Sequence, residues 1–108
     1  MPGKRSITES EQPFTLNNAA GQNGPAKFVD RFDLVGAVVE FHSFSGVPGS
    51  FDLEGTVDGN QWSKIQIGVT ADVRITLTHF WKALRVHTQT PGTPNPPVVV
   101  LGAHELLY

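Results

Sequence analysis

The chain has 108 residues, of which 39% are hydrophobic, and its eight basic and ten acidic residues give a net charge of −2. This length fits a single domain that buries about two-thirds of the surface exposed by its unfolded chain. The balanced charge argues against a nucleic-acid-binding protein, because such proteins neutralise phosphates with basic residues, and the absence of cysteine excludes disulfides, thiolate nucleophiles and cysteine-ligated zinc.

The N-terminal segment is polar and ends at a proline. No apolar run follows Lys4 and Arg5, so this start lacks the pattern of a secretory signal. The longest apolar run in the chain, 98–101, is too short to cross a membrane. We predict that residues 1–13 form a flexible arm, either loose or docked on a neighbouring subunit, and that residues 14–108 form one β-sandwich domain.

Short β-like segments alternate with turn residues after this arm. No stretch has a helical period, and the run from Thr88 to Pro97 contains four prolines, so it is predicted to form neither strand nor helix. We therefore predict an all-β fold, an antiparallel β-sandwich of jelly-roll-like form with seven or eight strands. The candidate strands are 14–16, 27–34, 36–44, 51–57, 62–67, 73–80, 83–88 and 98–107, the last with a kink or bulge at Gly102.

The segment 51–57 has the clearest two-residue period in the chain. Its alternation is expected to place Phe51, Leu53 and Val57 in the core and Asp52, Glu54 and Thr56 in water. The step from Asp58 to Gly59 then turns the chain toward Trp62, because glycine tolerates the positive φ of a hairpin turn, and Asp58 is expected to cap that turn. The predicted core includes Phe51, Leu53, Trp62, Ile75, Leu77, Leu84 and Val86.

No residue pattern points to catalysis, a cofactor or a metal. Asp52 and Glu54 share a strand face, but solvation explains this pair, since glycoside hydrolysis needs two carboxylates across a cleft. No serine lies in a nucleophile elbow, and no glycine-rich loop matches a phosphate cradle. We therefore predict that the protein is not an enzyme. The histidines form no pair with metal-ligand spacing and are expected at the solvent or at a rim of the sandwich; they are His42, His79, His87 and His104.

The most specific stretch of the chain is Phe51-Asp52-Leu53-Glu54-Gly55-Thr56-Val57-Asp58-Gly59-Asn60-Gln61-Trp62. It resembles a hairpin that recurs in small β-sandwich structural proteins of tailed bacteriophages and in discoidin-like carbohydrate-binding jelly rolls. In both groups a leucine-arginine-valine strand often follows, as Leu84-Arg85-Val86 does here. The resemblance covers about residues 51–88. Its glycines and tryptophan serve the hairpin, so it indicates a fold rather than a function.

The phage group is favoured because the chain is shorter than a typical discoidin-like domain and has no cysteine. This resemblance implies a non-enzymatic virion protein that is made in the host cytoplasm and needs no cofactor. The expected role is that of a capsid decoration or cement protein. Such a protein is expected to bind the major capsid protein or another virion protein as a homo-oligomer, with a trimer favoured. Neither nucleic acid nor a membrane is an expected partner.

Two alternatives are kept. One is a tail or baseplate component of a virion. The other is a carbohydrate-binding jelly-roll module in which Trp62, Trp81 and Tyr108 stack on sugars, although a small sandwich needs aromatic residues first for its core or a subunit interface. In the assembly interpretation, residues 1–13 and the proline-rich run from Thr88 to Pro97 are expected to supply contact surfaces.

Overall fold

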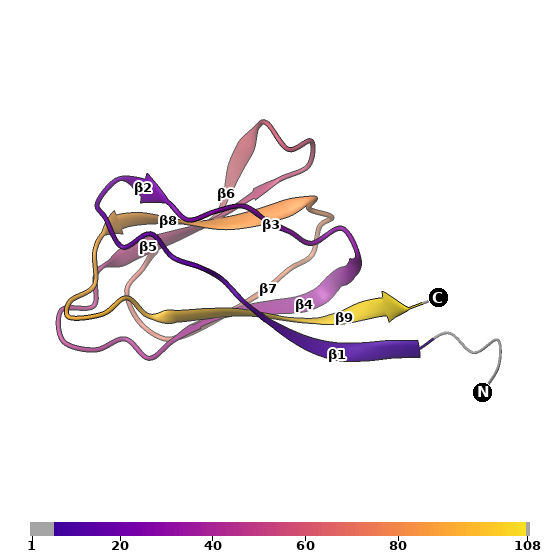
Figure 1. Ribbon diagram of the computed structural model, residues 1–108, viewed down its shortest axis with the longest axis horizontal. Coiled ribbons are helices and arrows are strands. Elements are labelled where there is room, and N and C mark those ends of the chain that lie inside the picture. Colours follow the sequence, from indigo (N-terminus) through magenta and orange to yellow (C-terminus); the bar gives the residue numbers. More distant parts are fainter. Residues whose placement is uncertain (1–5, 108) are drawn as a thin grey trace.

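The computed structural model describes the backbone of residues 6–107 and the side chains of residues 11–105. Every regular element in this part of the chain is a β-strand, and the strands form two antiparallel sheets packed face to face (Figure 1). The predicted all-β sandwich is confirmed. The strands of the described residues are β1 (Ser6–Pro13), β2 (Gln22–Asn23), β3 (Lys27–Phe28), β4 (Phe32–His42), β5 (Ser50–Thr56), β6 (Trp62–Val69), β7 (Val73–Thr76), β8 (Ala83–Thr90) and β9 (Val98–Leu107).

The strand order is that of a jelly roll. Sheet A has the order β1-β9-β4-β7, and sheet B has the order β2-β8-β5-β6, with β3 also paired to β8. After β3, successive strands lie in opposite sheets except in the β5–β6 hairpin, which is the connection pattern of two Greek keys. The short strands β2 and β3 pair with different parts of β8. Together β2 and β3 take the place of one edge strand. The nine strands therefore fill the eight strand positions of a jelly roll.

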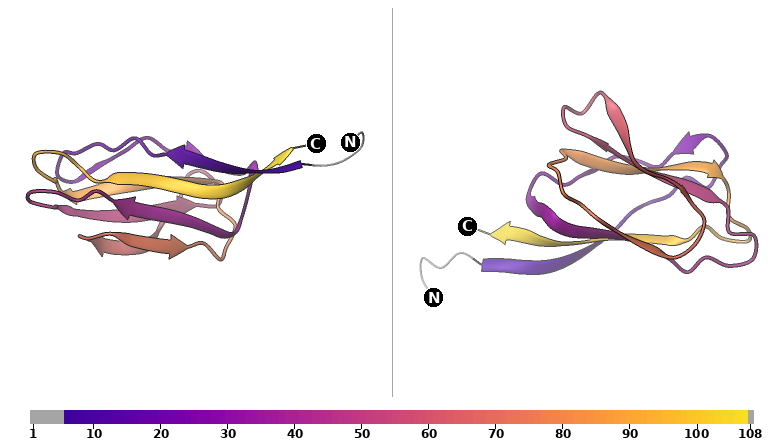
Figure 2. Two further views of the ribbon diagram at one scale, coloured as in Figure 1. Left: turned by 90° about the horizontal axis from the view of Figure 1, so that it is seen from below. Right: turned by 180° about the vertical axis from the view of Figure 1, so that it is seen from behind.

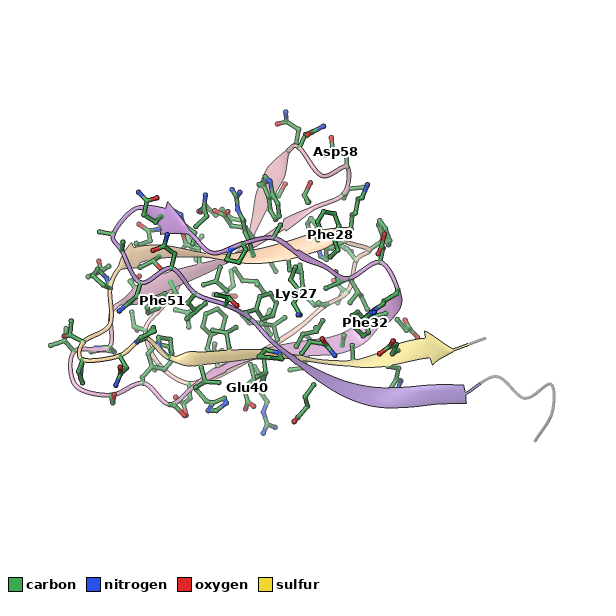
Figure 3. All side chains as sticks on the ribbon, viewed as in Figure 1. Lys27, Phe28, Phe32, Glu40, Phe51 and Asp58 are labelled. Carbon is green, nitrogen blue, oxygen red and sulfur yellow. The ribbon has the colours of Figure 1, made fainter. Side chains whose placement is uncertain are left out.

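The core lies between the sheets and is built from the alternating side chains of both inner faces. All of the predicted core residues are buried there except Trp62. Val39 and Phe41 of β4 belong to the same buried cluster as Phe51 of β5, and Figure 3 shows Phe51 between the two layers. Val57, which alternation places in the core, is exposed, because β5 ends at Thr56 and the hairpin turn begins at Val57.

The N-terminal segment contains an edge strand. Ser6–Pro13 form β1, which pairs with β9 along its whole length, from Ser6 opposite Leu107 to Pro13 opposite Val100. Backbone hydrogen bonds to β9, which is far from β1 in the sequence, stabilise this edge strand, although its polar sequence has no hydrophobic period. The flexibility expected of residues 1–13 stays a prediction, and residues 1–5 lie outside the described part of the chain.

Several strand boundaries also differ from the prediction. Residues 14–16 are not a strand, and β8 continues to Thr90 instead of ending where the proline-rich run was placed. β9 passes through Gly102 without a bulge. The irregularity lies opposite, in β4, where the register shifts between Asp33 and Val38.

The proline-rich loop between β8 and β9 is fastened to the sandwich. The side-chain amide of Asn18 donates to the carbonyl of Gly92 at 2.8 Å and accepts from its N–H at 3.0 Å. Val47 and Thr93 exchange two backbone hydrogen bonds of 2.9 and 2.8 Å. The loop is therefore held at the end of the sandwich opposite the free ends of β1 and β9 (Figure 1).

The molecule is elongated, with extents of 51 × 28 × 19 Å and a radius of gyration of 14.5 Å. A compact domain of this length has a radius of gyration of about 13 Å. The extra length comes from β1 and β9, which run together past the rest of the sandwich (Figures 1 and 2). We call this projecting pair of strands the β1–β9 ribbon.

Candidate functional site

The outer face of sheet B, on the side away from sheet A, carries a buried ion-pair network. Alternation along β5 correctly directs Asp52, Glu54 and Thr56 to this face, but they do not lie in water. Asp52 has no exposed surface, Glu54 is 5% exposed and Thr56 is fully buried. The prediction of a solvated face is wrong, because alternation fixes the direction of a side chain but not what covers it. Long side chains from β6 and β8 cover this face.

Asp52 accepts hydrogen bonds from both strands that flank β5. One carboxylate oxygen accepts from the backbone N–H of Gly68 in β6 at 2.9 Å. The other accepts from Lys64 Nζ at 2.9 Å and from Gln89 Nε2 at 2.8 Å. A carboxylate is stable in a buried position only when it is paired and hydrogen-bonded in this way.

Glu54 shares Lys64 with Asp52. One of its oxygens accepts from Lys64 Nζ, and the other accepts from Arg85 Nε at 2.6 Å. The register explains these contacts, since Glu54 lies directly opposite Lys64 in β6 and Arg85 in β8. Arg85 also lies over the indole ring of Trp62, with 4.0 Å between its guanidinium carbon and the ring centre. This is cation–π geometry.

The network favours the ionised form of both acids. Burial raises the pKa of Asp52, but the hydrogen bonds from Gly68 and Lys64 outweigh burial and bring this pKa below its ordinary value of 3.8. Burial also raises the pKa of Glu54, and the hydrogen bonds from Lys64 and Arg85 bring it below 4.5. Partial burial lowers the pKa of Lys64, but its two carboxylate partners outweigh this effect and raise the pKa above 10.5.

These two acids do not have the properties of a glycosidase pair. General acid catalysis needs a carboxyl group whose pKa is raised, so that it carries a proton near neutral pH. Asp52 and Glu54 have lowered pKa values, and each of their oxygens accepts a hydrogen bond. Asp52 and Glu54 therefore act as hydrogen-bond acceptors that hold the side chains of Lys64 and Arg85 on the outer surface of sheet B.

The aromatic residues are not arranged as the predicted sugar platform. Trp62 is partly buried on the outer face of sheet B, opposite Thr56, so its assignment to the core is wrong. Trp81 packs against the core and covers Gly55, where an added Cβ would lie 2.6 Å from the indole ring. It therefore does not share a surface with Trp62. Tyr108 lies outside the described residues.

The hairpin turn after β5 is capped by Asp58, as predicted. Oδ1 of Asp58 accepts from the N–H groups of Gln61 at 2.9 Å and Asn60 at 2.8 Å, and from the Thr56 hydroxyl at 3.1 Å. These hydrogen bonds lower the pKa of Asp58. Gly59 has a φ of 92°, the positive value for which glycine is favoured. Figure 3 shows Asp58 at the tip of the protruding hairpin.

The histidines lie apart from one another. His42 and His104 are on the outer face of sheet A, His87 is on the outer face of sheet B, and His79 is on the β7–β8 loop. His42 and His87 each share a hydrogen bond of 2.7 Å with a serine or an asparagine. Among the described residues, no three acidic or histidine side chains are grouped so that they could hold a metal ion. The same residues contain no helix that is long and apolar enough to cross a membrane.

Strand β1 has a free backbone edge. The N–H of Phe14 donates to the carbonyl of Val99 at 2.9 Å. In an antiparallel ladder the backbone N–H and C=O groups of successive residues point alternately to opposite sides of the strand. This bond therefore shows that the backbone groups of even-numbered residues of β1 point to β9, and that those of odd-numbered residues point away from it. The N–H groups of residues 9 and 11 therefore point away from sheet A, and no other strand of residues 6–107 pairs with them. Pro13 fits this pattern, because proline has no N–H to present at an edge.

A groove of about 640 Å³ lies on the outer face of sheet A, lined by residues of β4 and β9 and by Glu11 of β1. Its floor is at Gly102, where no side chain fills the space, and its walls include Glu11, Asp33, His104 and the exposed Val35. The register shift in β4 lies at the groove and turns Val35 outward. Such a volume is enough for side chains of a partner, since small-ligand pockets span roughly 300–1,000 Å³.

Sequence analysis missed Lys64 and Arg85 as the partners of the acids on sheet B, and it missed Phe28 as an exposed aromatic residue. Lys64 and Arg85 become important only through their pairing with Glu54, which no local pattern reveals. Phe28 lies in a strand of two residues and is 58% exposed. An aromatic residue in so short a strand gives no periodic signal, so the sequence could not assign it to a face.

Comparison with known proteins identifies no relative. The chain matches no protein-family profile, no curated protein and no solved structure. A functional proposal therefore depends on the jelly-roll topology and on the surfaces described above.

Proposed function

We propose that this chain is a non-enzymatic structural protein of a bacteriophage virion, and that it acts as a capsid decoration or cement protein bound to the assembled shell as a homo-oligomer. The fold supports this proposal, because jelly rolls recur in viral capsid proteins. The hairpin from Leu53 to Trp62 supports it through its resemblance to small phage structural proteins. A fold alone does not define a function, and the strongest support comes from one edge of the molecule.

The observation that carries the proposal is the free edge of β1 on the β1–β9 ribbon. The backbone groups of residues 9 and 11 point outward from a ribbon that reaches beyond the sandwich. A strand edge of this kind pairs readily with a strand of another chain. Because the edge lies on the longest projection of the molecule, a partner strand can approach it without contacting the body of the sandwich.

The charge of β1 restricts how identical copies can pair. A twofold contact of two antiparallel β1 strands centred on Glu11 would bring the Glu11 carboxylates of the two copies close together, and facing like charges destabilise a sheet. This disfavours a twofold dimer through β1. A head-to-tail contact, in which β1 meets a different surface of the next copy, forms a ring such as a trimer when the rotation between successive copies closes.

Exposed apolar side chains lie on three neighbouring segments of the chain. The connections that carry Phe28, Val57 and Phe80 are joined by backbone hydrogen bonds from Val29 to Lys82 and from Lys82 to Thr56. Single exposed apolar residues are ordinary, whereas a group of them marks an interaction surface. This group therefore supports contact with another protein; a tail or baseplate protein would use the same surfaces.

The experiment compares two substitutions at one position of the free edge. Glu11→Pro removes an outward N–H without breaking a hydrogen bond to β9, whereas Glu11→Ala removes the same carboxylate and keeps the N–H. Each purified variant is added to particles of the encoding phage that lack this protein, and the bound fraction is measured by sedimentation.

We expect Glu11→Pro to bind the particles about tenfold more weakly than Glu11→Ala, a difference of about 1.4 kcal/mol. Circular dichroism of both variants checks that the sandwich is intact. Equal binding of the two variants would remove the β1 edge from the proposal. Failure of the unmodified protein to bind these particles would overturn the virion assignment itself.

A further inference from the structure

The groove on the outer face of sheet A carries two carboxylates on its walls. Glu11 of β1 and Asp33 of β4 both line the groove, and both are exposed. Among the described residues that line it, none is a lysine or an arginine, and His104 is the one other titratable group. We call Glu11 and Asp33 the groove acids. They give the groove an excess of negative charge.

The cations of the described chain do not neutralise the groove acids. Arg74 pairs with Glu40, and Arg31 pairs with Glu105, so these two arginines are bound to other acids of sheet A. No ion pair in the described part of the chain involves either groove acid. A partner that supplies positive charge to the groove would therefore complement this face.

The groove also has apolar surface beside its charges. Val35 is 73% exposed on the wall, and the floor at Gly102 has no side chain. Lysine and arginine combine an apolar stem with a terminal cation. Such a side chain can pack its stem against Val35 and keep its cation beside the groove acids. The groove therefore fits a long basic side chain better than a purely apolar one.

The free edge of β1 places a partner residue next to this groove. Glu11 lies opposite Gly102, and Leu101 and Ala103 on either side of Gly102 are buried, so the Glu11 side chain is on the outer face of sheet A. The backbone groups of residue 11 point to the free edge. In an antiparallel pairing, the partner residue directly opposite exchanges both backbone hydrogen bonds with residue 11, and its side chain lies beside Glu11 on the same face.

A second partner position lies close to the other groove acid. Asp33 and residue 9 both lie opposite His104, so Asp33 is level with residue 9 of β1. The partner residue opposite residue 9 is two positions from the one opposite residue 11. Because side chains two positions apart share a face of a strand, both partner side chains point to the groove side.

We propose that the strand which adds to β1 comes from a partner protein and carries lysine or arginine at the two alternate positions opposite residues 9 and 11. This inference rests on the proposed use of the β1 edge and specifies the chemistry of its partner. The partner segment is extended and is basic on the face that lies over the groove. Opposite charges on neighbouring strands stabilise the pairing and fix its register.

The probe is an acetylated and amidated heptapeptide in which three lysines alternate with four threonines, titrated into the full chain and followed by NMR. A peptide with glutamate in place of lysine is the charge control. The double variant Glu11→Gln, Asp33→Asn removes both groove charges. The double variant Asp30→Asn, Asp72→Asn is its matched control, because it removes two exposed carboxylates outside the groove and gives the same net charge.

We expect the lysine peptide to shift the amide signals of residues 9 and 11 of the unmodified protein, and the glutamate peptide to leave them unchanged. The groove variant is expected to weaken binding of the lysine peptide about fivefold, since two exposed ion pairs are lost. The control variant is expected to change this binding less than twofold, because its carboxylates lie away from the bound strand.

Three results would overturn the proposal. The first is no binding of the lysine peptide by the unmodified protein, and the second is equal weakening by the two double variants. The third is binding of the glutamate peptide as tight as that of the lysine peptide. Such a failure is distinguishable from failure of the proposed function. Both particle-binding variants, Glu11→Pro and Glu11→Ala, lack the carboxylate, so their comparison tests the β1 edge independently of charge.

Discussion

Replacement of Lys64 by methionine tests whether the network on sheet B stabilises the fold. Among the residues whose side chains are described, Lys64 is the one cation that bonds to both Asp52 and Glu54, and methionine keeps the apolar stem while removing the charge. Removing one partner of a fully buried ion pair costs about 3–5 kcal/mol. Lys64 is 46% exposed, so solvent screens part of this loss, and Arg85 still holds Glu54. We therefore expect Lys64→Met to lower the free energy of unfolding by about 1–3 kcal/mol at pH 7.

The measurement is urea unfolding followed by circular dichroism at pH 7 and at pH 3. The loss must shrink at pH 3, because protonation in the variant removes the charge on Asp52, which Lys64 no longer pairs, and the charge on Glu54, which Arg85 alone then pairs. Arg74→Met is the matched control, since Arg74 pairs with Glu40 on the exposed face of sheet A, and we expect no measurable change. Equal stability of Lys64→Met and the unmodified protein at pH 7, or an equal loss at both pH values, would refute the reasoning.

Further changes test the acids and the packing at Gly55. The lowered pKa values of Asp52 and Glu54 stabilise the fold at pH values above 3.8 and 4.5, and this contribution is lost as the pH falls through the lower folded values. Acid titration of the unmodified protein should therefore show a steeper loss of stability below pH 4 than titration of the double variant Asp52→Asn, Glu54→Gln; identical curves would be incompatible with the lowered pKa values. Gly55→Ala places a Cβ 2.6 Å from the Trp81 ring and should cost about 1–3 kcal/mol in urea unfolding, whereas a neutral result would mean that the ring is not held there.

The sequence predicts the architecture well where hydrophobic alternation is strong. In β4 and β8, alternate apolar residues identify both the strand and the face that enters the core, as Val39 and Val86 show. The polar segment 6–13 gives no such signal, because its strand exists only through hydrogen bonds to β9, about ninety residues away. Non-local pairing of this kind is not encoded in a local period.

One shift in register explains the two side chains that were assigned to the wrong side. A turn over residues 58–61 would place Trp62 opposite Val57, with both side chains directed into the core. The hairpin loop instead includes Val57, so Trp62 lies opposite Thr56 and points outward. A shift of one residue in the register reverses the face of every side chain in a strand. An Asp-Gly turn signal predicts a hairpin but does not fix the length of its loop to within one residue.

The candidate site was accessible to sequence analysis only in part. The acids at 52 and 54 were found, but their burial depends on Lys64 and Arg85, which reach across from two other strands. Solvation was the simpler expectation for alternating acids on one strand, since Asp and Glu are rarely buried without partners. Knowledge of the strand order was needed to see that each acid has such a partner.

The proposal implies that a phage encodes this chain, and mass spectrometry of density-gradient-purified particles of such a phage tests it most directly. If the chain is a decoration or cement protein, it is present in a fixed ratio to the major capsid protein and cannot be washed off by buffer alone. If it is absent from purified particles, or present only in traces that vary between preparations, the protein is not a structural component of the virion.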